Sequence, residues 1–295
     1  MKTSIITLLA LTVIFTSCKK GSDDTADPVV DNSTNNSVST VPSTFTQKVL
    51  LEIFTGAGQS QCTDGFVKEK SIIDGYSTTA IPVRIHYSDA MEIAYYTSME
   101  STFNNGNPPT FPSAMVNRTP SLGMVILNRT QWMSNFLTAK SKTATCGLAI
   151  ITSVSGNIAT IEVHSGFKQA LTGTINLTVM LTEDNVTGNG NQFDQRNSYN
   201  TTAGHTYYGS GDPIVGFNHT HTLRKLITAT LGDLIPSAVT SASGEYVKTF
   251  TVNISAYKAA DLSVVAFINK EGTTSTTHEV LNAQIVKLGN TQNWD

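Results

Sequence analysis

The chain has 295 residues, of which only 14% are charged, and its formal net charge at pH 7 is −3. A near-neutral chain lacks the excess of basic residues that nucleic-acid binding requires, so we exclude nucleic acid as a partner. The length is sufficient for two domains of ordinary size, each with its own hydrophobic core.

The N-terminal segment has the pattern of a bacterial lipoprotein signal. A weakly basic start is followed by an apolar run over 5–15, which is too short to span a bilayer as a stable helix. Small residues then precede Cys18, as in a lipobox, where the thiol is acylated and the chain is cut before it. We therefore predict a signal peptide over 1–17 and a membrane anchor through lipid on Cys18. An ordinary secretory signal cut nearby is the alternative.

Residues 18–46 are predicted to form a flexible tether, because Ser, Thr, Asn, Asp and Pro dominate this stretch. Asp23 and Asp24 follow shortly after Cys18. This pattern resembles the surface-export tether of Bacteroidetes lipoproteins. The resemblance implies an outer-membrane lipoprotein that faces the cell exterior, with the periplasmic face as the alternative.

Residues 47–143 alternate between strand and helix patterns. The predicted elements are a strand over 48–54, a helix over 60–74, a strand over 80–87, a helix over 90–103, strands over 111–118 and 122–127, and a helix over 129–142. This βαβαββα order is typical of thioredoxin, although related orders are common among α/β domains. We predict a thioredoxin-like domain here.

Residues 144–295 show a period of two instead. The predicted strands are 148–154, 158–163, 175–181, 246–252 and 262–268, with one helix near 223–235. Gly-rich turns separate several of these strands, as in an antiparallel β-sandwich of the Ig-like type. The predicted fold class is therefore α/β followed by all-β.

Several stretches in this order resemble one family. They are 49–56 (VLLEIFTG), 111–118 (FPSAMVNR), 217–224 (FNHTHTLR), 264–270 (VVAFINK) and 280–283 (VLNA). Behind a lipobox, this set resembles the Bacteroidetes outer membrane protein 28 family, thioredoxin-like lipoproteins with a C-terminal β-domain. The resemblance covers most of the chain after residue 47. It implies that 49–56 leads into an active-site turn and that Pro112 is a cis-proline beside it.

The chain departs from this family at the turn. Many members carry Cys-x-x-Cys, but here Gln59 stands at the first cysteine position and Cys62 at the second. The first cysteine is the attacking thiol, which a helix N-terminus activates by stabilising its thiolate. Gln59 cannot attack, so we favour a non-enzymatic protein in which Cys62 is a buried apolar filler. A monothiol redox protein acting through Cys62, with Pro112 holding a peptide, is the alternative.

Two further groups of residues are candidates for ligand binding. Gln59, Cys62, Phe111 and Pro112 would border a groove for an extended peptide, although a rigid turn without a ligand is the simpler interpretation. His219 and His221 are two residues apart and would share one face of a strand, with Arg224 nearby.

We predict no metal, because no third ligand stands at a diagnostic spacing from the two histidines. We also predict no cofactor, since no phosphate-binding glycine loop is present. Cys62 and Cys146 are expected as free thiols, although the sequence leaves their pairing open.

Together these features predict a non-catalytic binding or adhesion module at the outer-membrane surface, whose partner is an extended peptide or a surface protein. The alternatives are monothiol chemistry at Cys62, and binding of a metal or small ligand through His219 and His221.

Overall fold

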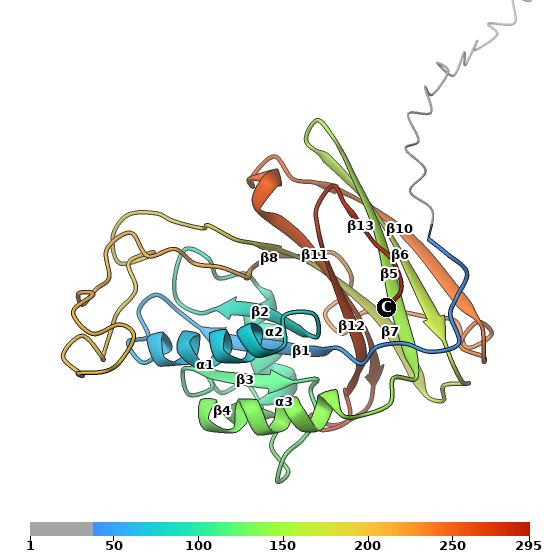
Figure 1. Cartoon of the computed structure of the whole chain (residues 1–295), viewed down its shortest axis with the longest axis horizontal. Helices are drawn as coiled ribbons and strands as arrows, with labels where there is room; N and C mark the ends of the chain where they lie inside the picture. Colours follow the sequence, from blue (N-terminus) through green and yellow to red (C-terminus); the bar gives the residue numbers. More distant parts are fainter. Residues whose placement is uncertain (1–37) are drawn as a thin grey trace, which may run out of the picture. The chain divides into compact units, whose positions relative to one another are not determined.

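The computed structural model describes residues 38–295, which form one compact unit (Figure 1). The predicted signal peptide over 1–17, the lipidation site Cys18 and most of the predicted tether lie outside this range. Within it, strands predominate over helices.

The α-helices are α1 (Cys62–Gly75), α2 (Tyr95–Phe103) and α3 (Trp132–Lys140), with short 3-10 helices at Arg129–Gln131 and Ala259–Asp261. The strands are β1 (Val49–Thr55), β2 (Ala80–His86), β3 (Ser113–Val116), β4 (Ile126–Asn128), β5 (Cys146–Ser155), β6 (Ile158–Phe167), β7 (Thr174–Glu183), β8 (Thr222–Leu226), β9 (Asp233–Leu234), β10 (Glu245–Asn253), β11 (Leu262–Glu271), β12 (Val280–Lys287) and β13 (Thr291–Gln292). The βαβαββα order predicted for 47–143 is confirmed.

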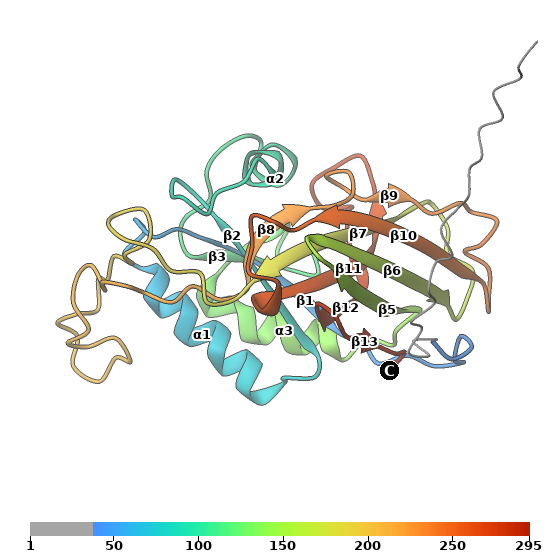
Figure 2. The same ribbon diagram turned by 90° about the horizontal axis from the view of Figure 1, so that it is seen from above.

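Two sheets organise these strands. The larger has nine strands in the order β12-β11-β7-β8-β2-β1-β3-β4, with β9 paired to β7, and the smaller has the order β10-β6-β5-β13. In the larger sheet β1 pairs with β2 in parallel and with β3 in antiparallel fashion. Strand β8 joins β2 where Arg84 lies opposite Thr222. One sheet therefore continues across the boundary that we place at residue 143 (Figure 2).

Alternation along β1 distributes its side chains to two different cores. Val49, Leu51 and Ile53 pack with α1 and α3, whereas Leu50 and Phe54 pack with α2 on the opposite face. Successive side chains of a strand point to opposite faces, so an apolar run of this kind is typical of a strand covered on both sides.

The third core lies between the two sheets in the C-terminal half. Residues of β7 and β11 that face the smaller sheet pack against residues of β5 and β6, among them Leu177, Val264, Ile150 and Ile161. The alternate residues Val265 and Phe267 of β11 belong to the core around α2. The predicted strands of this half are therefore present. β7 and β11 are buried on both faces, whereas β6 is buried mainly on one face.

A buried ion pair connects β1 to the segment after β3. Arg118 is fully buried, and its Nε and Nη2 donate to the two carboxylate oxygens of Glu52 at 2.7 and 2.8 Å. The Tyr95 hydroxyl of α2 lies 2.7 Å from Arg118 Nη2 and 3.0 Å from Glu52 Oε1. Phe267 of β11 stacks on the guanidinium, with its ring centre 5.0 Å away. Arg118 therefore has a structural role.

Two element predictions are wrong. The helix predicted near 223–235 is strand β8 followed by a turn and β9, because the backbone of 222–226 completes the pairing between β7 and β2. The strand predicted over 122–127 begins only at Ile126, since Leu122 and Gly123 take positive φ values of 53° and 81° in an exposed turn.

Helix α2 also begins five residues later than predicted, at Tyr95 instead of 90. The Asp89 carboxylate accepts the N–H groups of Ala57 and Met91 at 2.8 Å each. These bonds hold the residues before α2 in a turn, where a carboxylate competes with helix formation for backbone donors.

Candidate functional site

The turn after β1 places Cys62 at the first residue of α1, where its side chain is fully buried. Burial raises the pKa of the Cys62 thiol to about 11, although hydrogen bonding with Thr55 and Gly56 lowers it in part. The thiol is therefore protonated at neutral pH, and the thiolate needed for attack is scarce. Gln59, one turn earlier, is half-buried and accepts the Cys62 N–H with its carbonyl.

The second thiol behaves in the same way. Cys146 begins β5, is fully buried and has no disulfide partner, and burial raises its pKa to about 12. Cys62 is likewise free, so the structure has both thiols in the unpaired form that we expected.

Pro112 lies beside the turn, as the resemblance implied. The Phe111–Pro112 peptide bond is cis, and Pro112 is buried. A Cβ atom placed on Gly65 would lie 2.7 Å from the Pro112 Cβ. Pro112 therefore approaches the first turn of α1 too closely for any residue other than glycine at position 65. Phe111 stacks on Tyr87 with ring centres 5.1 Å apart. The structure thus brings Cys62 and Pro112 to the same end of α1.

A loop from the other half of the chain covers this turn. The loop joins β7 to β8 and is drawn in yellow to orange beyond the start of α1 (Figures 1 and 2). Its residues 195–198, which we call the covering segment, run alongside the turn. Arg196 N–H donates to the Ala57 carbonyl at 2.8 Å, and Ser198 N–H donates to the Ser60 carbonyl at 2.9 Å.

Side chains of the covering segment reinforce these bonds. The Gln195 amide is fully buried and donates to the carbonyls of Gly56 and Gln59 at 3.3 and 3.1 Å. Asn197 accepts from the Thr63 hydroxyl at 3.2 Å. The backbone acceptors of the turn are therefore engaged by the chain's own donors, which leaves them unavailable to an external peptide.

The two predicted histidines do not form a strand face. His219 sits in an isolated bridge with Val186, and His221 takes a positive φ of 53° just before β8. His219 is fully buried, with Nε2 2.8 Å from the Phe193 carbonyl oxygen and its ring against that of His86. Burial, together with His86, lowers the pKa of His219 to about 4, so the imidazole is neutral at pH 7.

The remaining predicted ligand residues also have structural contacts. His221 Nδ1 lies 3.5 Å from Asp184 Oδ1, and burial lowers the His221 pKa. Arg224 Nε lies 3.1 Å from Glu183 Oε2, and its guanidinium stands over the Tyr257 ring. Among residues 38–295, no three His, Cys, Asp or Glu side chains are grouped so that they could hold a metal.

A cleft of about 320 Å³ opens next to these residues, between α1 and the β7–β8 loop. Its apolar walls include Phe66 and Phe217, whose rings stack with centres 5.4 Å apart, and Tyr207. At its floor Arg84 Nε donates to Glu69 Oε2 at 2.8 Å, while the buried Glu69 Oε1 has no donor in the described part of the chain.

None of the residues predicted to bind a ligand, apart from His221, lines this cleft. Two residues in the sequence could have indicated the cleft. They are Arg84, a charged residue within an apolar strand, and Glu69, an acidic residue on the buried side of a predicted helix. Buried opposite charges usually pair, so the two could have been matched in advance.

Comparison with known proteins supplies a family and a fold. The family model described as "Outer membrane protein Omp28" matches residues 100–292, a range that includes Pro112 and 217–224 but not the turn at Cys62. The structure is similar to HBP35 of Porphyromonas gingivalis, one of the Bacteroidetes, with a TM-score of 0.62, 18% identity, and coverage of 83% of this chain and 76% of that chain. At this identity the likeness shows a shared fold.

A protein of Agrobacterium tumefaciens gives a TM-score of 0.49 at 12% identity, over 83% of this chain and 95% of that chain. No curated protein matches the sequence. Within residues 38–295, none of the helices has both the length and the apolar character needed to cross a bilayer.

Proposed function

This chain belongs to the outer membrane protein Omp28 family, and on that premise we propose that it is a non-catalytic binding or adhesion module. In this proposal lipid on Cys18 holds the protein at the outer membrane, and the folded part faces the cell exterior. Its partner is an extended peptide or a surface protein.

We further infer that 47–143 is a degenerate thioredoxin-like domain and that 144–295 is a β-sandwich joined to it. The strand order β2-β1-β3-β4, with β1 and β2 parallel, β3 antiparallel to β1 and β4 antiparallel to β3, supports the first inference. The packing of β7 and β11 against β5 and β6 supports the second.

The observation that carries the non-catalytic role is the state of Cys62. The thiol is fully buried, its pKa is raised to about 11, and the covering segment binds the adjacent turn. A redox-active cysteine needs the opposite environment, one that is accessible and stabilises the thiolate. The cleft with Phe66, Tyr207 and Phe217 supports a binding role instead, because apolar walls with a few polar groups are the usual form of a ligand site.

The proposal is tested by the alkylation rate of Cys62 as a function of pH. In the folded full-length protein we expect no labelling of Cys62 by iodoacetamide below about pH 9, since the thiol is protonated and buried. Mass mapping separates Cys62 from Cys146, and Cys62→Ser is the control. Rapid labelling near pH 7 would establish a reactive thiol and favour monothiol chemistry.

The membrane anchor has a separate test. Cells grown with labelled palmitate should incorporate label into the wild-type chain and none into Cys18→Ala. Incorporation that persists in Cys18→Ala would place the lipid elsewhere and remove this part of the proposal.

A further inference from the structure

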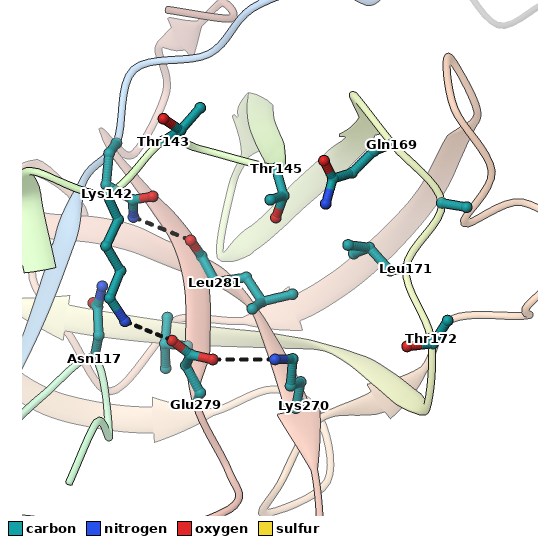
Figure 3. A pocket seen from close by; sticks show the side chains of 13 residues that line it. Asn117, Lys142, Thr143, Thr145, Gln169, Leu171, Thr172, Lys270, Glu279 and Leu281 are labelled. Carbon is teal, nitrogen blue, oxygen red and sulfur yellow. Dashed lines mark hydrogen bonds and ion pairs between the residues drawn. The ribbon is translucent and has the colours of Figure 1, made fainter.

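A second cavity, of about 280 Å³, lies beside the segment that precedes β1, whereas Cys62 lies beyond the other end of this strand (Figure 3). Six separate parts of the chain line it. They are Gln47 before β1, Asn117 after β3, Lys142, Thr143 and Thr145 between α3 and β5, residues 169–172 between β6 and β7, Lys270 of β11, and residues 279–281 at the start of β12.

The charged groups of this cavity have an excess of donors. Lys142 Nζ lies 2.8 Å from Glu279 Oε1, and Lys270 Nζ lies 3.1 Å from Glu279 Oε2. Two ammonium groups thus share one carboxylate, which leaves a formal charge of +1 in a chain of net charge −3. Each ammonium has three N–H donors and uses one of them on Glu279, so the others are free to bind a ligand.

The carboxylate between the lysines is ionised. Burial opposes ionisation of Glu279, but hydrogen bonds from Lys142 and Lys270 outweigh burial and hold its pKa below the usual value. Both of its oxygens are already engaged by ammonium groups. Glu279 therefore positions the two lysines and offers little acceptor capacity to a ligand.

Asn117 adds a buried donor to the same wall. Its side chain is only 3% exposed, and its Oδ1 accepts the Leu50 N–H at 2.7 Å. This bond fixes the amide so that Nδ2 is the group left over, and in residues 38–295 no acceptor is paired with it. Figure 3 places the Asn117 amide beside the Lys142 side chain. An amide held in this way is preorganised to donate to a bound acceptor.

The opposite wall supplies further polar groups around a small apolar area. Thr145, Gln169 and Thr172 line it, next to Leu171 and Leu281. Hydroxyl and amide groups of this kind fix the orientation of a polar ligand without adding charge.

We propose that this cavity binds a small ligand through an oxyanion group, a carboxylate, phosphate or sulfate, held between Lys142 and Lys270 with Asn117 Nδ2 as a third donor. Hydrogen bonds from ammonium groups to an anionic oxygen are among the strongest in proteins, and here three donors from different segments converge. The site does not depend on the proposed function, because it shares no residue with the turn at Cys62 or with the aromatic cleft.

The test is a calorimetric titration of the full-length protein in detergent with sodium phosphate, sodium sulfate and sodium glucuronate at constant ionic strength. We expect at least one anion to bind with a Kd of about 1 mM or below, and the anion that binds identifies the preferred oxyanion. Replacing both lysines, as Lys142→Gln/Lys270→Gln, should weaken binding by at least about tenfold.

Two single variants make the result specific. Glu279→Gln should tighten binding, because it releases both ammonium groups from their competing carboxylate, whereas a purely structural ion pair predicts no gain. Lys248→Gln is the matched control, since Lys248 forms a similar half-exposed pair with Asp233 and lies outside the cavity. The proposal fails if none of the three anions binds at up to about 10 mM. It also fails if binding persists unchanged in the double lysine variant.

Discussion

The two ends of strand β1 have opposite polar chemistry. At the carboxyl end the covering segment occupies the carbonyls of the turn, and Cys62 is sealed beneath it. At the amino end the segment before β1 borders a cavity in which Lys142, Lys270 and Asn117 keep unused donors. The residues that resemble a redox motif thus mark the closed end of the strand, and the free donors are at the other end.

The largest expected effect on stability comes from breaking the buried ion pair between Glu52 of β1 and Arg118. Arg118→Met leaves the Glu52 carboxylate buried without its partner, so we expect the free energy of unfolding to fall by about 3–5 kcal/mol. Urea unfolding followed by circular dichroism measures this change.

A matched variant distinguishes the charge from the packing. The double variant Glu52→Leu/Arg118→Met should recover a large part of the loss, because no buried charge is then left unpaired. The exposed pair of Lys70 and Asp74 is the control, and Lys70→Met should change stability by less than about 0.5 kcal/mol. A loss below about 1 kcal/mol for Arg118→Met would contradict the assigned role of the pair.

The closed end should also respond to pH through His219. The pKa of His219 is about 4 in the folded protein and 6.5 in a free side chain, so the unfolded state takes up the proton first as the pH falls. Stability from this group is therefore complete above about pH 6.5 and is lost towards pH 4, by about 2–3 kcal/mol.

Unfolding midpoints in urea at pH 7 and at pH 4.5 test this dependence. His219→Gln should flatten the profile between these pH values without abolishing it, because His221 and His278 have lowered pKa values as well. An unchanged profile in His219→Gln would show that His219 does not titrate as the structure predicts.

A smaller effect on stability is expected when the covering segment loses side-chain hydrogen bonds to the turn. Gln195→Ala removes the amide that donates to Gly56 and Gln59, which should reduce stability by about 1–2 kcal/mol. Native-state labelling of Cys62 should become measurably faster, because local opening of the turn then requires less free energy. The control is Arg196→Ala, whose side chain pairs with Asp212 while its backbone bond to Ala57 is retained. Equal labelling rates in the two variants would show that the side-chain bonds of Gln195 do not control the accessibility of Cys62.

Much of the local structure follows from the sequence. The apolar run over 48–54 predicts a strand, and the period of two in residues 144–295 predicts antiparallel strands. Pro112 is cis as the family resemblance implies, and Cys62 lies at the start of a helix close to the one predicted over 60–74. The element predictions succeed because they depend on side-chain period, which acts within a few positions of the chain.

The error over 223–235 has a tertiary cause. Residues 223–235 have a pattern that fits a helix, yet 222–226 forms β8 because its backbone has partners on both sides in β7 and β2. A gap between two strands is a property of the sheet and is not encoded in any short window, so tertiary pairing overrides the local preference.

The amino-acid sequence by itself shows that Gln59 and Cys62 do not form a Cys-x-x-Cys motif. It is not sufficient to show that the site is closed, because the closing residue Gln195 stands 136 positions beyond Gln59. The same holds for the open cavity, whose donors Asn117, Lys142 and Lys270 come from separate segments. Burial, pKa and unused hydrogen-bond donors depend on which distant segments meet, and that is settled when the chain folds.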